Sequence, residues 1–185
     1  KVGNIMPYSG PASAYGVIGK TQDAYYKKIN AEGGINGRKI NFISYDDAYS
    51  PPKTVEQARK LVESDEVLIV FNPLGTPPNT AIQKYLNSKK VPQLFVATGA
   101  TKWNDSKNFP WTMGWQPNYQ SETQIYAKYI LKEKPNAKIG ILYQSGALWS
   151  SMTLAENIAI PLEAYTSLGP REIAEVASLK LALVG

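Results

Sequence analysis

The sequence predicts an α/β protein built on a doubly wound parallel sheet. Over residues 1–144, short apolar runs alternate with longer segments in which apolar residues recur at helical spacing. Two of the apolar runs lead directly into loops that contain Gly and Thr. Ligands of such sheets bind beyond the carboxyl ends of the strands, so these loops also indicate where a ligand site lies.

The first strand and helix come from the N-terminal segment. Val2–Met6 is a short apolar strand, and turn-forming residues follow it. A helix is predicted over Ala14–Ala31, because apolar residues recur there at mostly helical spacing. These apolar positions are Val17, Ala24, Tyr25 and Ile29. Gly33 and Gly34 end the helix in the manner of a C-cap.

The same order of strand and helix repeats through the rest of residues 1–144. Further strands are predicted at Lys39–Tyr45, Val67–Phe71, Val91–Ala97, Trp111–Trp115 and Ala137–Tyr143. Helices with an apolar stripe are predicted at Lys53–Glu63, Asn79–Ser88 and Tyr119–Lys134. Strands joined by helices at this spacing pair in parallel, which gives the predicted fold class.

Residues 145–185 follow a different pattern. A helix is predicted over Thr153–Leu168, and Pro161 is expected to kink or split it. Gly169 and Pro170 then break the chain, and Arg171–Leu183 predicts an apolar-rich helix. We therefore divide the chain into an N-terminal ligand-binding lobe at 1–144 and a divergent tail at 145–185.

The composition excludes several classes of active site. The chain has no histidine and no cysteine, which excludes His and Cys nucleophiles, zinc sites of the usual N/S kind and disulfides. Its net charge of +5 comes from scattered lysines, a pattern that predicts a solvated surface and no nucleic-acid partner. No apolar stretch approaches the roughly 20 residues that span a bilayer. Lys1 does not open a signal peptide, so we expect that any export signal has been removed or lies outside this sequence.

The two loops are the candidate ligand site. Asn72–Thr76 follows the third predicted strand, and Ala97–Thr101 follows the fourth. Two prolines come after the first loop and suit the first helical positions, but they donate no hydrogen bond. The remaining donors are the N–H groups of Gly75, Thr76 and Asn79 and the Thr76 hydroxyl. They suit a small anionic or zwitterionic ligand at a positive helix end. Alternatively, Thr76 only caps the following helix.

An acidic pair offers a different kind of site. Asp46 and Asp47 follow the second predicted strand, at the same edge of the sheet. A metal-dependent α/β enzyme could use them with a divalent cation. The alternative, which we favour, is that both carboxylates cap turns and helix N-termini.

Aromatic residues are dense beside the same edge. Candidates for the walls of a pocket are Trp103, Trp115 and Tyr119, with Tyr15 and Trp111 nearby. Their rings could enclose an apolar side chain or contact an ammonium group. The alternative is that most of them pack loops onto the sheet.

Several motifs occur in the order found in one family of binding proteins. Residues 7–16 (PYSGPASAYG) resemble the S-G-P-x-x-x-x-G opening of the substrate-binding proteins of branched-chain amino-acid ABC transporters. Residues 30–38 (NAEGGINGR) are similar to that family's N-x-x-G-G-[IV]-x-G-[RK] segment. Residues 74–76, 90–100 and 138–144 continue the resemblance, which covers about residues 1–144.

The resemblance implies a type I periplasmic binding fold, in which two α/β lobes enclose a ligand cleft, here with the second lobe apparently missing. It implies a receptor that is not an enzyme and uses no cofactor or metal. Such a receptor binds an amino acid of the Leu, Ile or Val type, or a similar small carboxylate, in the periplasm and delivers it to a membrane permease. An amino-acid- or amide-sensing regulatory module of the same fold is the alternative.

The resemblance also implies which residues hold the ligand. These are Tyr15, Gly75, Thr76, Ala97, Thr98 and Ala100, with Thr101 as a further candidate. In a two-lobed receptor each lobe supplies part of the contact. One lobe alone is therefore expected to bind weakly, with a dissociation constant of about a millimolar or more.

Overall fold

The computed structural model describes residues 1–138 and 153–183. The chain forms two compact units, Lys1–Pro135 and Asn136–Gly185, which are described separately. The predicted boundary at 144/145 lies outside the described residues. No helix in the described ranges is long and apolar enough to cross a membrane.

The first unit contains the predicted parallel sheet. Its strands are β1 (Val2–Met6), β2 (Phe42–Asp46), β3 (Ile69–Phe71), β4 (Gln93–Val96) and β5 (Thr112–Gly114). They pair in the order β2-β1-β3-β4-β5, and every pair is parallel. The carboxyl ends of all five strands therefore meet at one edge, and the strand order reverses between β1 and β3.

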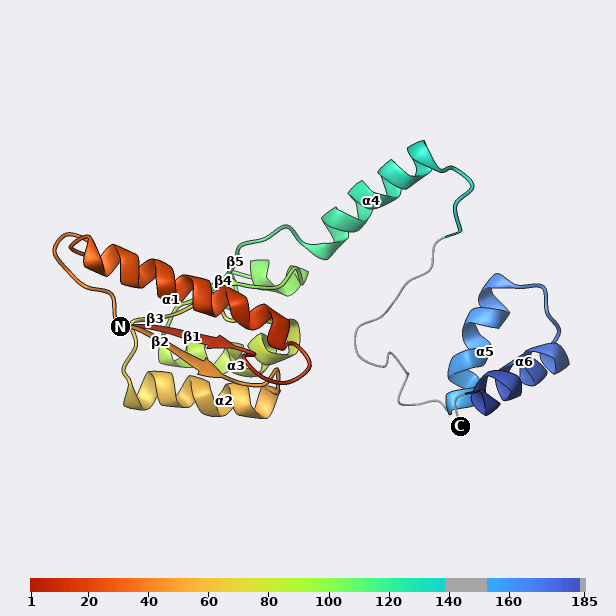
Figure 1. Cartoon of the computed structure of the whole chain (residues 1–185), viewed down its shortest axis with the longest axis horizontal. Helices are drawn as coiled ribbons and strands as arrows, with labels where there is room; N and C mark the ends of the chain where they lie inside the picture. Colours follow the sequence, from red (N-terminus) through yellow and green to blue (C-terminus); the bar gives the residue numbers. More distant parts are fainter. Residues whose placement is uncertain (139–152, 184–185) are drawn as a thin grey trace. The chain divides into compact units, whose positions relative to one another are not determined.

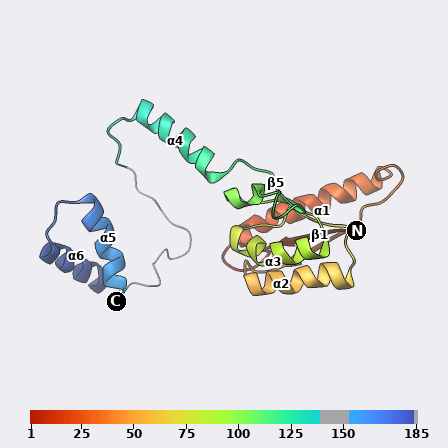
Figure 2. The same cartoon turned by 180° about the vertical axis from the view of Figure 1, so that it is seen from behind.

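Helices cover both faces of the sheet, which confirms the doubly wound class. The helix α1 (Gly16–Ala31) lies on one face, and α2 (Pro51–Arg59) and α3 (Thr76–Lys89) lie on the other (Figures 1 and 2). A π-helical turn at Lys60–Ser64 extends α2. The core between the sheet and α2 and α3 consists of Ile5, Ala58, Leu61, Val67, Val70, Ile82 and Leu86.

The apolar stripe predicted for α1 is wrong. Val17 and Tyr25 are 61% and 57% exposed, whereas Gly16 and Gly19 are buried. A β-carbon on Gly19 would lie 2.9 Å from Cζ of Tyr8, so the tyrosine ring occupies the place where side chains would pack. The helix thus approaches the sheet through its glycines.

The other helices of this unit occur where they are predicted, with shifted ends. α3 begins at Thr76 and includes both prolines in its first turn, where their missing N–H groups leave no bond unmade. α4 spans Tyr119–Glu133, and most of its side chains are exposed. The strand predicted at Ala137–Tyr143 falls largely outside the described residues, and residues 137 and 138 are not in a strand.

The second unit contains two helices that pack against each other. α5 spans Leu154–Tyr165 and begins with a capping box made by Thr153 and Glu156. α6 spans Pro170–Ala182 and buries Ile173 and Ala177. Pro161 lies inside α5 and does not split it, since the helix continues on both sides of the missing N–H.

Candidate functional site

The two predicted loops are joined to each other beyond the ends of β3 and β4. Leu74 and Ala97 form an isolated parallel bridge. The Gly75 N–H donates to the Ala97 carbonyl at 3.3 Å, and the Ala97 N–H donates to the Pro73 carbonyl at 2.9 Å. The loops therefore act as a short continuation of the sheet, and they hold Gly75 and Ala97 side by side.

The side chain of Asn79 holds the backbone of the first loop in place through hydrogen bonds. Its side-chain Nδ2 donates to the carbonyls of Pro73 at 3.0 Å and Gly75 at 2.8 Å, and the residue is completely buried. Gln93 of β4 donates in turn to Oδ1 of Asn79 at 2.7 Å. This network of buried amides holds the backbone of the loop in one conformation.

The donor count made from the sequence needs correction. The N–H groups of Gly75 and Asn79 are occupied, the first by Ala97 and the second by the Gly75 carbonyl at 3.1 Å. Thr76 is not the N-cap either, because Gly75 holds that position with a φ of +96° and no side-chain cap bond. The N–H of Thr76, at the first helical position, has neither an intrahelical acceptor nor a partner in the second loop.

Hydroxyl groups from both loops converge at this helix end. Oγ1 of Thr76 is hydrogen-bonded to Oγ1 of Thr98, and Oγ1 of Thr98 lies 3.3 Å from the phenol oxygen of Tyr119. Thr98 is buried, whereas Thr76 is half-buried and Tyr119 is exposed. The buried Thr98 hydroxyl thus joins the hydroxyls of Thr76 and Tyr119, which are both more exposed, beside the positive end of α3.

The rest of the second loop leads into a short 3-10 helix, Thr101–Asn104. Ala100 is the residue before that helix and is half-buried, and Thr101 is its first residue and is exposed. Gly99 is covered by Tyr119, since a β-carbon there would lie 2.6 Å from Cδ1 of the ring. The Tyr119 N–H donates to the Gly99 carbonyl at 2.8 Å, which fixes the start of α4 against this loop.

The predicted pocket aromatics occupy different environments. Trp115 is 63% exposed just after β5, and Tyr15 and Tyr119 are each about half exposed at the carboxyl edge. Trp103 is only 3% exposed and packs on the β5 strand end, where a β-carbon on Gly114 would lie 3.0 Å from its Cβ. Trp103 thus packs the 3-10 helix onto the sheet in this unit, while the three others face solvent.

Asp46 and Asp47 build the turn after β2. Asp46 accepts the N–H groups of Tyr8, Ser9 and Ala48 at 2.8 to 3.1 Å and the Ser9 hydroxyl at 2.5 Å. Burial alone would raise the pKa of Asp46, but these hydrogen bonds together lower it below its usual value. The carboxylate is therefore saturated by turn donors.

Asp47 is similarly engaged. It accepts the Tyr49 N–H at 2.9 Å and the Thr54 hydroxyl at 2.7 Å, and it is 1% exposed. Burial raises its pKa, and hydrogen bonds from Thr54 and Tyr49 oppose that shift. Within the described ranges, no group of three or more acidic residues is placed to hold a metal ion. Both acids accept turn N–H groups, as favoured from the sequence, but neither caps a helix N-terminus, because Ser50 is the N-cap of α2 and has no side-chain cap bond.

The same turn places a residue that the sequence did not single out. Tyr49 directs its ring at Gly75, where a β-carbon would lie 2.9 Å from Cζ and 3.0 Å from the phenol oxygen. In the sequence, only its position could have indicated Tyr49 as a site residue, because it follows the second strand and therefore lies at the carboxyl edge of the sheet.

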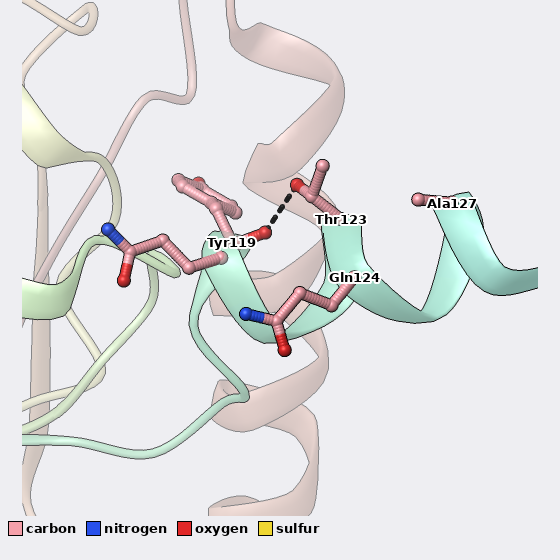
Figure 3. A pocket seen from close by; sticks show the side chains of 5 residues that line it. Tyr119, Thr123, Gln124 and Ala127 are labelled. Atoms are coloured by element: carbon pink, nitrogen blue, oxygen red, sulfur yellow. Dashed lines mark hydrogen bonds between the residues drawn. The ribbon is translucent and has the colours of Figure 1, made fainter.

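An open depression of about 400 Å³ runs along one side of α4. It is lined by Tyr119, Gln120, Thr123, Gln124 and Ala127, all from this one helix. Figure 3 shows the Thr123 hydroxyl turned back onto the Tyr119 carbonyl, to which it donates at 2.6 Å. Since no second element contributes to the lining, we do not assign the ligand site here; the depression meets the joined loops only through Tyr119.

Comparison with known proteins gives consistent matches. Residues 1–158 match the periplasmic binding protein family. The chain is 28% identical over 164 residues to the Leu/Ile/Val-binding protein homolog 3 of Brucella melitensis, covering 86% of this chain and 43% of that protein.

Two solved structures share the fold. The branched-chain amino-acid transporter substrate-binding protein LivJ of Streptococcus pneumoniae, in complex with isoleucine, matches with a TM-score of 0.67 and 22% identity over 90% of this chain and 46% of its own. A solute-binding protein of an ABC transporter from Rhodopseudomonas palustris, in complex with 3,4-dihydroxybenzoic acid, matches with a TM-score of 0.58 and 26% identity over 72% of this chain and 36% of its own. The chain thus spans less than half the length of each of these relatives.

Proposed function

Because the chain belongs to the periplasmic binding protein family, we propose that its five-stranded unit is the first ligand-binding lobe of a solute-binding protein for an ABC importer. The proposed ligand is a branched-chain amino acid or a similar small carboxylate, passed outside the cytoplasm to a membrane permease. The observation that carries this proposal is the pair of joined loops, which brings the hydroxyls of Thr76 and Thr98 together at the N-terminus of α3.

A carboxylate matches the chemistry of this helix end. The Thr76 N–H can donate to a carboxylate, and so can the hydroxyls of Thr76, Thr98 and Tyr119 when they turn from one another to the ligand. The helix dipole adds roughly 0.3–2 kcal/mol for a negative charge. The nearest acids, Asp46 and Asp47, are saturated by their own turn, so they do not compete for these donors.

The ligands named for the relatives share this carboxylate. Isoleucine and 3,4-dihydroxybenzoic acid are both carboxylic acids, and they differ in the group attached to it. We therefore assign the carboxylate to the joined loops, and the attached group to the tyrosines around them and to the part of a two-lobed receptor that faces this lobe. None of the relatives' names describes an enzyme, and the saturated acidic pair gives no reason to propose catalysis.

The test is calorimetric titration of the intact protein, with its mass first measured by mass spectrometry. The ligands are L-leucine, L-isoleucine, L-valine, L-phenylalanine and benzoate, with L-leucinamide as the matched compound that lacks the carboxylate. We expect at least one acid to bind and leucinamide to bind at least tenfold more weakly than leucine. Equal affinity for leucine and leucinamide, or no binding by any acid, would refute the proposal.

Two variants link the binding to the loops. Thr76→Val and Thr98→Val remove one hydroxyl each at nearly constant volume, so every acid that binds is expected to bind about tenfold more weakly, as for the loss of one charge-assisted hydrogen bond. Thr21→Val is the matched control, because Thr21 is exposed on α1 and bonds only within its helix. It should leave the affinities unchanged.

A further inference from the structure

Tyr49 is held in a conformation that most residues avoid. It has a φ of +60°, and Ala48 before it has a φ of +49°. Non-glycine residues in this left-handed region are uncommon and persist where the surroundings fix them. Here the fixing groups are the two carboxylates, because Asp46 accepts the Ala48 N–H at 2.9 Å and Asp47 accepts the Tyr49 N–H at 2.9 Å. Asp46 and Asp47 thus fix the direction of the Tyr49 side chain.

That side chain lies on the candidate site. The Tyr49 ring covers Gly75, which precedes Thr76 at the start of α3. The glycine leaves the ring in direct contact with the backbone of the ligand-binding loop, with no side chain between them. The ring therefore lies against the residue that directly precedes Thr76.

Two other tyrosines belong to the same group. Burial raises the pKa of Tyr49, and the phenols of Tyr119 and Tyr15 raise it further, with a smaller contribution from Asp47. Tyr15 directly precedes α1 in the segment after β1, so it lies at the same carboxyl edge of the sheet. Tyr119 in turn covers Gly99 and reaches Thr98, so each glycine of the two joined loops carries one tyrosine ring.

We propose that Tyr49 is a specificity-determining residue of the ligand site, whose ring, with those of Tyr15 and Tyr119, encloses the group attached to the ligand carboxylate. The inference rests on the proposed function, since it assumes a carboxylate at Thr76. Tyr15 ends a 3-10 helix after β1, Tyr49 lies in the turn after β2, and Tyr119 is the first residue of α4, which follows β5; all three therefore lie at the carboxyl edge of the sheet. A ligand with a compact apolar side chain fits this enclosure, and removal of the Tyr49 ring opens room for a bulkier one.

The test uses the intact protein and two substitutions of Tyr49. Tyr49→Asn removes the ring and keeps the backbone, because Asn is enriched in the left-handed region. Tyr49→Phe keeps the ring and removes the hydroxyl. Calorimetric titration with L-valine, L-leucine and L-phenylalanine should show that Tyr49→Asn weakens the best wild-type ligand at least tenfold and shifts the preference toward the bulkier side chain. Tyr49→Phe should stay within about threefold of wild type.

A matched control and a second measurement keep the outcomes distinct. Tyr25→Asn makes the same change on the exposed side of α1, ten residues and about 15 Å along the chain from Tyr15, and should leave the affinities unchanged. If wild type binds a ligand and Tyr49→Asn, folded by circular dichroism, binds all three amino acids as wild type does, the inference is overturned and the proposed function stands. If Tyr49→Asn does not fold, Tyr49→Gly, which also removes the ring and adopts a positive φ without strain, replaces it under the same criterion. Absence of binding by wild type overturns both.

Discussion

The buried amide of Asn79 is expected to be the main support of the first loop, and Asn79→Leu tests this. The substitution removes the hydrogen bonds to the carbonyls of Pro73 and Gly75 and leaves Nε2 of Gln93 without its best acceptor. Both carbonyls keep a second donor, from the N–H groups of Ala97 and of residue 79 itself. Loss of each hydrogen bond to a carbonyl is therefore expected to lower the free energy of unfolding by about 1 kcal/mol. Leaving the buried Gln93 amide without its acceptor is expected to lower it by about 1–2 kcal/mol.

The expected loss is thus about 3–4 kcal/mol in the free energy of unfolding, measured by urea denaturation. Hydrogen exchange of the Gly75 and Ala97 amides, which join the two loops, should accelerate more than exchange in β1, since the change acts on the loops first. Gln124→Leu removes an exposed amide from α4 as the control and should cost less than about 0.5 kcal/mol. A loss below 1 kcal/mol for Asn79→Leu, or uniform acceleration of exchange, would refute the idea that this side chain supports the loop.

Three further predictions concern the same edge of the sheet and one surface pair. Gly75→Ala should lower the free energy of unfolding by about 1–3 kcal/mol in thermal or urea denaturation, because the φ of +96° is strained for alanine and the Tyr49 ring occupies the space. Asp46 has a lowered pKa, so its contribution to stability is present above the unfolded pKa and is lost as the pH falls through the folded value. Asp46→Asn should therefore flatten the acid side of a plot of the free energy of unfolding against pH. Asp47 has a pKa raised by burial, so its own contribution to stability is lost as the pH rises through the folded value. Burial and the hydrogen bond to Glu63 raise the pKa of Tyr85 to about 12, so its contribution is present below pH about 10 and fades as the pH rises through about 12. Ultraviolet titration of wild type against Tyr85→Phe should show the loss of the latest-titrating phenol.

The sheet was predictable because its strands are buried runs that end at turn residues. The period of apolar residues predicted five of the strands and their parallel pairing. The glycines and threonines after β3 and β4 indicated the edge of the sheet at which we propose the ligand site. The face of α1 was not predictable from that period. Its contact is made by Gly16 and Gly19 under the Tyr8 ring, and further along by Tyr26 against Phe42 and Phe71, and a glycine contributes nothing to an apolar stripe.

The supports of the site were hidden for a related reason, since they are long-range polar contacts. Asn72 adopts a φ of +51°, and its Nδ2 donates to the Phe95 carbonyl at 2.7 Å. Phe95 itself has a φ of +56°, at an irregularity in the pairing of β4 with β5. Asn is enriched in the left-handed region, but nothing in the sequence marks Asn72 in particular, and Phe rarely adopts this conformation. The pairing depends on which strands become neighbours, and that is known only once the sheet order is known.

The two ends of the candidate site are built on different principles, and this bears on how its specificity can change. The carboxylate end consists of backbone and two threonines, and it is fixed by Asn79 and Gln93 in the interior. Substitutions there cost stability before they alter preference. The other end, as we propose it, consists of the rings of Tyr15, Tyr49 and Tyr119, which come from the segments after β1, β2 and β5 and are not part of the core. Substitutions that change ligand preference while preserving the fold are therefore expected in those three loops, and substitutions in the loops after β3 and β4 are expected to weaken all ligands together.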